Sequence, residues 1–310
     1  YFRNFYGRRV LRIFPLYYGF LTIVWITSLA TASGEVGQSF LDTQRWYWLY
    51  LSNIQVALFG WQTPVQIGHF WSLAVEEQFY LLWPWIVWSL DRKQLIRVAI
   101  IGFFVALSIR IALPFEMTRL GAYVLLPTRM DALSAGAILA LAIRGPKGLN
   151  ALDRASVILL IVCAAILAGL YLRQRRLDLM DPLVGTLGFT VIAAGFASFI
   201  AVALRAPHDG FLSRVLSAAP MVMLGKYSYG LYVVHVPLIY LLRNLGLQAS
   251  LFPTFAGSSL PGVAVFTLLA MAVSIAVAAA SFHFWETPLI KLKRYFTYAK
   301  NPPRKEKALQ

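Results

Sequence analysis

Eight apolar segments follow one another along the chain, each bounded by polar or basic residues. A helix needs about 20 apolar residues to cross the hydrocarbon layer of a membrane. The segments that meet or approach this length run approximately over residues 10–31, 69–90, 98–114, 128–143, 155–172, 183–204, 226–243 and 262–285. The pattern predicts an all-α fold, a polytopic bundle with about eight transmembrane helices.

The stretch from Arg45 to Trp61 is aromatic and apolar, but Ser52, Asn53 and Gln55 interrupt its centre. Lipid offers no hydrogen-bond partners to polar groups at that depth. We therefore predict a short interfacial or re-entrant helix here and not a further span.

The composition agrees with a membrane environment. Of the 310 residues, 59% are hydrophobic and only 13% are charged. A soluble domain of this length has too few polar residues to cover so much apolar surface. Many of the 9 Trp, 15 Tyr and 21 Phe lie at the ends of apolar runs, where aromatic rings can sit among lipid headgroups.

The net charge of +15 comes from short basic clusters between apolar runs and not from one basic domain. This distribution favours contacts with membrane lipid and argues against a nucleic-acid partner. If residues 45–61 do not span, twenty of the 28 Lys and Arg residues lie on the side of residue 1 and eight on the other. Basic loops stay in the cytosol, so we predict a cell-membrane protein with both ends of the chain cytosolic. The RQRR cluster at 173–176 is the exception.

We expect one transmembrane domain over residues 1–292 and a basic, disordered cytosolic tail over residues 293–310. The single Cys163 permits neither a disulfide framework nor a thiolate metal site. No metal and no permanently bound cofactor are expected.

Polar residues inside the apolar segments are the first candidates for chemistry, because ionisable groups in a membrane are costly and usually functional. On a helix, Ser72 and Glu76 share one face, since they lie four residues apart. We expect Glu76 to point into a polar cavity. The structural alternative is that Glu76 pairs with an arginine and holds helices together.

A second helix face carries Ser228, Tyr232 and His235, again at helical spacing. His235 lies deep in its apolar segment and could line a cavity. The alternative is that it is a hydrogen-bonded residue of the helix core.

Three arginines, Arg8, Arg9 and Arg12, stand at the entrance to the first span. Arginine suits bidentate recognition of phosphate. Juxtamembrane arginines also serve simply as lipid anchors, so both interpretations remain open.

Two further sites have a structural interpretation. Thr128 and Asp131 have the spacing of a capping box that starts a helix. Arg129 beside them could face a cavity. Near the end of the last span, Glu286 could neutralise one of the arginines at the start of the first.

Taken together, these segments resemble the membrane-bound acyltransferases of acyltransferase family 3. The family shows four blocks that occur here in the same order: R-R-x-x-R-I-x-P at 8–15, W-S-L-x-V-E-x-Q-F-Y at 71–80, S-Y-x-x-Y-x-x-H-x-P at 228–237 and E-x-P at 286–288. The second block is highly specific, and the resemblance covers essentially the whole chain.

The resemblance implies transfer of an acyl group, with acetyl expected, from cytosolic acyl-CoA to a hydroxyl of a cell-envelope or exported glycan. Acyl-CoA would be a co-substrate. The catalytic residues would be Glu76, Ser72 and His235. Substrate contacts are expected from Arg8, Arg9, Arg12, Trp71, Arg129 and Tyr232.

Family members usually begin with two further spans, the first of which carries a histidine thought to act as the catalytic base. The present sequence opens at the cytosolic block that normally follows them, so we expect a chain that lacks these helices. Two alternatives to an active transferase are a transporter or flippase for a glycan or small solute, and an inactive, truncated remnant.

Overall fold

The computed structural model of the chain describes residues 1–31, 35–61, 65–112, 115–178, 181–252, 254–255 and 257–297. Within these ranges the secondary structure is helical, and strand-type pairing is confined to an isolated bridge between Phe255 and Ser258. The predicted all-α fold is confirmed.

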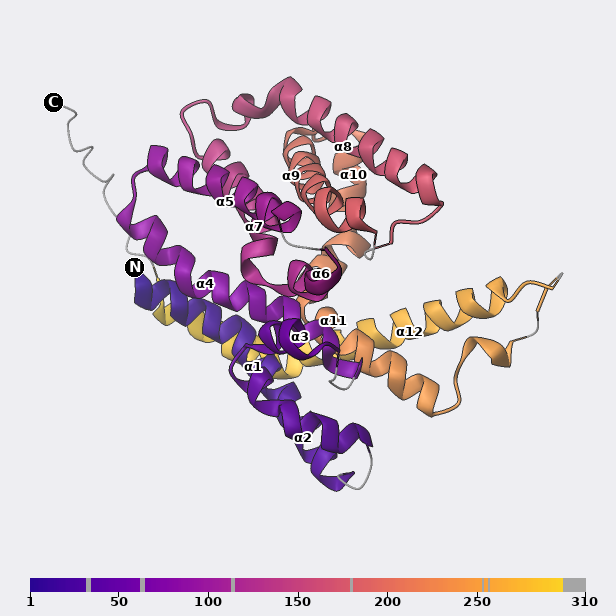
Figure 1. Ribbon diagram of the computed structural model, residues 1–310. Helices are drawn as coiled ribbons and strands as arrows, with labels where there is room; N and C mark the ends of the chain where they lie inside the picture. The colour runs from indigo at the N-terminus through magenta and orange to yellow at the C-terminus, as the bar shows by residue number, and fades with distance from the viewer. Residues whose placement is uncertain are drawn as a thin grey trace. The chain divides into compact units, whose positions relative to one another are not determined.

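Figure 1 shows the helices in chain order, from indigo at the first residue to yellow near the last. Within the described ranges they are α1 (Phe2–Ala30), α2 (Glu35–Trp48), α3 (Ser52–Phe59), α4 (Trp71–Ser89), α5 (Arg92–Ala112), α6 (Phe115–Val124), α7 (Leu126–Ile143), α8 (Asp153–Gln174), α9 (Phe189–Arg205), α10 (Phe211–Ser217), α11 (Ala219–Asn244), α12 (Leu260–Ser281) and α13 (Thr287–Lys291). π-Helical turns lie at Val184–Gly188, before α9, and at Phe282–Glu286, after α12.

Six helical segments of the described chain are long and apolar enough to cross a membrane. They are Phe2–Ala30, Arg92–Ala112, Leu120–Ile143, Arg154–Gln174, Val184–Arg205 and Leu260–Tyr295. Each contains most of one predicted span. The other two predicted spans are α4 and α11, whose 19 and 26 residues suffice in length, although neither is among the six most apolar segments. The chain is thus a polytopic helical membrane protein, and the count of eight spans stays a prediction.

Large apolar side chains cover the outside of the helices. On α8, for example, Ile158 is 60% exposed and Ile161 62% exposed. A water-soluble protein rarely exposes such a continuous apolar surface. These side chains are suited to contact with lipid, which is as apolar as they are.

The polar-centred stretch 45–61 does not form one long helix. Helix α2 ends at Trp48, Tyr50 takes a left-handed backbone conformation with φ of 53°, and α3 starts at Ser52. Since an α-helix rises about 1.5 Å per residue, the 8 residues of α3 reach about 12 Å. That is less than half of the hydrocarbon thickness of about 30 Å. The structure therefore agrees with a short helix that does not span by itself.

A pair of amide side chains holds α3 against α4. Asn53 Nδ2 donates to Gln78 Oε1 at 3.1 Å, and Gln78 Nε2 donates to Asn53 Oδ1 at 2.8 Å. Gln78 Nε2 also donates to the carbonyl oxygen of Tyr50 at 2.9 Å. Gln78 belongs to the family-specific block of α4, so one function of that block is to dock the short helix.

The chain forms two compact units. Unit 1 comprises Tyr1–Gln44, Pro64–Ile67 and Met223–Gln310, and unit 2 comprises Arg45–Thr63 and Gly68–Val222. Each unit is described by itself below.

In unit 1, the start of α1 packs against the end of the described chain. Asn4 Nδ2 donates to the carbonyl oxygen of Thr297 at 2.8 Å. The ring of Phe296 lies against Gly7 so closely that a Cβ at this position would collide with it. The chain remains helical as far as Tyr295 and is described as far as Thr297, and residues 298–310 of the predicted tail lie outside the described residues.

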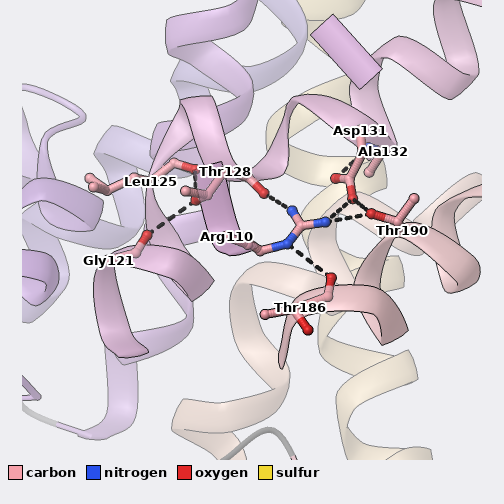
Figure 2. A network of polar contacts seen from close by, with 8 residues as sticks. All are labelled: Arg110, Gly121, Leu125, Thr128, Asp131, Ala132, Thr186 and Thr190. Carbon is pink, nitrogen blue, oxygen red and sulfur yellow. Dashed lines mark hydrogen bonds and ion pairs between the residues drawn. The ribbon is translucent and has the colours of Figure 1, made fainter. Parts of the chain in front are cut away.

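In unit 2, a buried ion pair ties α5 to α7 (Figure 2). Arg110 Nη2 lies 2.6 Å from Asp131 Oδ2, and both side chains are shielded from solvent. Thr190 of α9 joins the pair, since its Oγ1 accepts from Arg110 and donates to Asp131 at 2.9 Å. Arg110 also donates through Nε to the carbonyl oxygen of Thr186 at 3.1 Å and through Nη1 to that of Thr128. The network thus joins three helices and the π-helical turn before α9.

The capping-box prediction for Thr128 and Asp131 is wrong. Helix α7 begins at Leu126, so Thr128 lies inside its first turn, where its hydroxyl donates to the carbonyl oxygen of Leu125 at 2.8 Å. The carboxylate of Asp131 forms the ion pair with Arg110 instead. An unpaired buried charge costs several kcal/mol. The loss of a helix cap costs only about 1 kcal/mol, so pairing Asp131 with Arg110 is the more favourable use of this carboxylate.

The basic cluster at residues 173–176 has acidic partners nearby. Arg173 forms an ion pair with Asp181 at 2.5 Å, and Arg176 forms one with Asp178 at 3.3 Å. Burial favours the protonated form of Asp181, but the amide N–H of Val184 and the Arg173 side chain outweigh this effect and lower the pKa of Asp181 below its ordinary value. Local acids therefore neutralise part of a cluster that the positive-inside pattern leaves unexplained.

The first prediction concerns the buried ion pair. Replacing Asp131 with alanine should lower the free energy of unfolding by about 3–5 kcal/mol, because Arg110 would keep a buried charge without its carboxylate. Asp178→Ala, which removes a solvent-exposed pair, should change it by less than about 1 kcal/mol. Denaturant titration of the purified protein in detergent measures both. Equal effects of the two substitutions would contradict the assignment.

The second prediction concerns the amide pair. In Gln78→Glu the side chain can no longer donate to Asn53 and Tyr50, and two acceptors are left facing a carboxylate. We expect α3 to detach and its amide hydrogens to exchange at least about tenfold faster, in line with the 1–3 kcal/mol penalty of unpaired buried groups. The matched control is Gln94→Glu, since the exposed Gln94 uses Oε1 only as an acceptor, from the Asp91 N–H. Unchanged exchange in α3 would show that other contacts hold the helix.

Candidate functional site

The predicted site residues are divided between the two units. Unit 1 contains Arg8, Arg9, Arg12, Tyr232 and His235, and unit 2 contains Trp71, Ser72, Glu76 and Arg129. The structure therefore defines two clusters of candidate residues.

The first cluster is basic and lies where α1 meets the end of the described chain. Arg8 and Arg12 are exposed on one face of α1, and Arg8 Nη1 donates to the carbonyl oxygen of Phe296 at 3.3 Å. Lys293 lies within electrostatic range of Arg8, Arg9 and Arg12. We call these four residues the basic cluster. So many like charges repel one another, and an anion bound among them would relieve that repulsion.

Lys293 was not among the predicted site residues, because the sequence pattern assigned it to the tail. The contact that brings it to the arginines joins residues 288 positions apart in the case of Arg8 and Phe296. No local pattern signals such a contact. A run of basic residues directly after the last apolar segment was the one available hint.

Glu286 lies close to the basic cluster. It is 5% exposed, and Ser281 Oγ donates to its Oε1 at 3.2 Å. Arg12 is the arginine of the cluster that interacts electrostatically with it, without a direct ion pair among the contacts of the described residues. Of the three arginines proposed as partners of Glu286, the structure thus favours Arg12.

Helix α11 presents Tyr232 and His235, which are both half-buried, with ring centroids 5.8 Å apart. His235 Nδ1 lies 2.9 Å from the carbonyl oxygen of Tyr232. Because a carbonyl oxygen only accepts, the proton must be on Nδ1, and in the neutral ring Nε2 then carries the lone pair. Tyr229 of the same block donates its hydroxyl to the carbonyl oxygen of Ile13 at 2.7 Å and so anchors α11 to α1.

Helix α4 carries the specific sequence block. Glu76 is exposed, whereas its neighbour Glu77 and Ser72 are half-buried. Glu76 was predicted to point into a polar cavity. Unit 2 contains an apolar cavity of about 310 Å³ among α5, α7, α8 and α9. None of the predicted site residues lines this cavity. The roles of Ser72 and Glu76 stay predictions.

The second cluster surrounds Arg129 on α7 and is called the aromatic–arginine cluster, comprising Arg129, Tyr123, Phe189 and Trp71. The guanidinium carbon of Arg129 lies 4.6 Å from the ring centroid of Phe189 and 5.9 Å from that of Tyr123. Trp71 is buried, with its ring 4.7 Å from Tyr123. Cation–π contacts of this kind hold a guanidinium without using its N–H donors.

Comparisons with known proteins bear on what these clusters do. The acyltransferase domain of family 3 matches residues 1–279. The peptidoglycan O-acetyltransferase OatA of Listeria monocytogenes is 25% identical in an alignment 325 positions long, gaps included, which covers 97% of this chain and 50% of the relative. The O-acetyltransferase OatA of Staphylococcus aureus is 28% identical over 268 residues, 83% of this chain and 41% of the relative. The chain therefore spans about half the length of these curated relatives or less. No solved structure matches it significantly.

The domain match includes the arginine block of α1, the specific block of α4 and the serine–tyrosine–histidine block of α11. It also extends into both units and covers five of the six long apolar segments of the described chain in full, and the sixth as far as residue 279. The chain belongs to the family 3 membrane acyltransferases.

Proposed function

We propose that the chain transfers an acyl group, with acetyl expected, from acyl-CoA to a hydroxyl of a cell-envelope glycan. The observation that carries this proposal is the domain match over residues 1–279, together with relatives that are O-acetyltransferases. The peptidoglycan relative supports the glycan acceptor. Acyl-CoA is the donor that the family resemblance implies, and the basic cluster is compatible with it.

The basic cluster suits the donor. Coenzyme A carries phosphate groups, and arginine binds phosphate through two parallel N–H donors. Arg8 and Arg12 are exposed and lie four residues apart on one face of α1, so both can reach one polyanion. Lys293 adds a further positive charge within electrostatic range. An anion with more than one phosphate would therefore be held at several points.

The proposed orientation places the basic cluster in the cytosol, where acyl-CoA is available, in a multi-pass protein of the cell membrane. The excess of basic residues on the side of residue 1 supports this orientation. The hydrogen bond between Asn4 and Thr297 brings both ends of the described chain to the same end of unit 1. A common side for both ends is what an even number of spans requires.

In the proposed reaction the acceptor hydroxyl oxygen attacks the thioester carbonyl carbon. A C–O bond forms, the C–S bond breaks, the hydroxyl proton passes to a base, and coenzyme A leaves as its thiol. The family resemblance assigns that base to a histidine in the first of the two helices that precede the arginine block in family members. His235 could accept or return a proton at Nε2, while Ser72 and Glu76 would orient the acceptor. A cavity poor in water would strengthen each of these interactions.

The third prediction tests the donor site. The double substitution Arg8→Gln with Arg12→Gln should raise the KM for acetyl-CoA at least about tenfold with little change in kcat, because charge-assisted phosphate contacts bind the donor before and during reaction alike. The matched control is Arg3→Gln, another exposed arginine at the start of α1. An unchanged KM in the folded double variant would remove the basic cluster from donor binding.

The fourth prediction tests the acceptor side. Glu76→Gln should lower kcat by about a hundredfold or more without loss of folded protein, as expected when a group that assists proton transfer or orients the acceptor is lost. Glu77→Gln, the adjacent carboxylate, serves as the control. Transfer of radiolabel from acetyl-CoA to a glycan fraction measures the activity. Full turnover in Glu76→Gln would exclude an essential charge, and solute uptake without label transfer would favour a transporter.

A further inference from the structure

The guanidinium of Arg129 makes neither a hydrogen bond nor an ion pair among the described residues, and its Nη1 is buried without a partner. The side chain as a whole is half-buried in unit 2. Arginine carries five N–H donors in a planar fork. Buried donors are nearly always paired in folded proteins, so the buried Nη1 of Arg129 is a donor available to a bound group.

The carboxylate that acts on Arg129 electrostatically, that of Asp131, forms no ion pair with it among the described residues. Asp131 Oδ2 accepts from Arg110 and from Thr190, and Asp131 Oδ1 accepts from the amide N–H of Ala132. Arg110 and Asp131 neutralise each other, which leaves the positive charge of Arg129 in excess. The charged and titratable groups that act on Arg129 electrostatically are Asp131, Tyr123 and Arg110. A group with negative charge would compensate this excess.

The surroundings hold Arg129 in place before any ligand arrives. The preceding residue, Thr128, is held by two groups of hydrogen bonds (Figure 2). Its carbonyl oxygen accepts from Arg110, and its hydroxyl donates to the carbonyl oxygens of Leu125 and Gly121. The guanidinium itself lies over Phe189. A donor fixed in this way loses little conformational freedom on binding, which increases affinity. The buried ion pair of Arg110 therefore also positions the neighbouring arginine.

We propose that the aromatic–arginine cluster is a binding site for an anionic oxygen group, a carboxylate or a phosphate, that is bound by the fork of Arg129. Tyr123, which is half-buried and packs on the buried Trp71, adds a flat apolar surface of the kind that packs against a sugar ring or a lipid chain. Binding does not depend on acyl transfer. Identifying the anion as part of the acceptor rests on the proposed function.

The position of Arg129 along its helix points to the acceptor side. Helix α7 starts at Leu126, three residues before Arg129, and ends at Ile143. In the predicted topology the first residues of α7 lie on the side of the membrane that faces away from the cytosol. The basic cluster lies on the cytosolic side. The anion would then come from an acidic glycan or from a phospholipid of the outer leaflet, and not from coenzyme A.

The fifth prediction tests this site by binding, in the absence of acetyl-CoA. The purified chain in a non-ionic detergent should bind glucuronate at least about tenfold more tightly than glucose, or retain phosphatidylglycerol over phosphatidylcholine to the same degree, since hydrogen bonds to charged groups contribute about 1.5–3 kcal/mol. Calorimetry measures the first preference and mass spectrometry of retained lipid the second. The glucuronate result identifies a carboxylate ligand, and the lipid result identifies a phosphate.

Arg129→Gln should abolish the preference, and Arg129→Lys should retain part of it, because lysine keeps the charge but loses the fork. The lysine variant also keeps the test decisive if the glutamine variant does not fold. The matched control is Arg45→Gln, an exposed arginine of the same unit whose guanidinium lies 5.6 Å from the ring of Trp46 and whose loss should change nothing. No preference in the native chain, or a full preference in either folded Arg129 variant, would overturn the site.

The result is separable from that of the proposed function. Anion binding through Arg129 without label transfer from acetyl-CoA would support the site and contradict the transferase. Label transfer that is accompanied by no anion preference would support the transferase and overturn the site.

Discussion

The structure of unit 2 depends on one constraint, the high free energy of an unpaired charge inside a membrane protein. Arg110 is 1% exposed, and its guanidinium is satisfied by Asp131, Thr190 and the carbonyl oxygens of Thr128 and Thr186. Lipid provides no hydrophobic force that would pull helices together, so such polar contacts and close packing have to do it. One arginine thereby sets the mutual positions of α5, α7 and α9.

The same constraint links fold to function. The carboxylate of Asp131 pairs with Arg110 and not with Arg129, which lies two residues earlier on α7, and the buried Nη1 of Arg129 has no hydrogen-bond partner among the described residues. In unit 1 the corresponding feature is the basic cluster, in which like charges gather with Glu286 as the acidic group near Arg12. Both units therefore contain positive charge in excess of what the described protein atoms neutralise locally. The proposed reaction between an anionic donor and a glycan acceptor would use such charges to bind the substrates.

The specific sequence block of α4 combines structural and candidate catalytic residues. Gln78 docks α3 through Asn53, and Trp71 packs into the aromatic–arginine cluster. Ser72 and Glu76 occupy the positions between them. A motif that is recognised as a unit in the sequence thus consists of side chains with different tasks, and residue type alone does not separate the tasks.

The sequence by itself determined the helical class, the position of six segments long and apolar enough to cross a membrane, and the family, because a span length of about 20 apolar residues and short motifs are local properties. It also predicted that residues 45–61 would not form a regular span, since three polar side chains lie in their centre. Only the tertiary structure decided that Asp131 pairs with Arg110 instead of capping a helix, and that Lys293 joins the arginines of α1. The physical reason is that a charge takes its partner from whichever element folding brings within a few ångströms, and sequence spacing reveals such partners only within one helix.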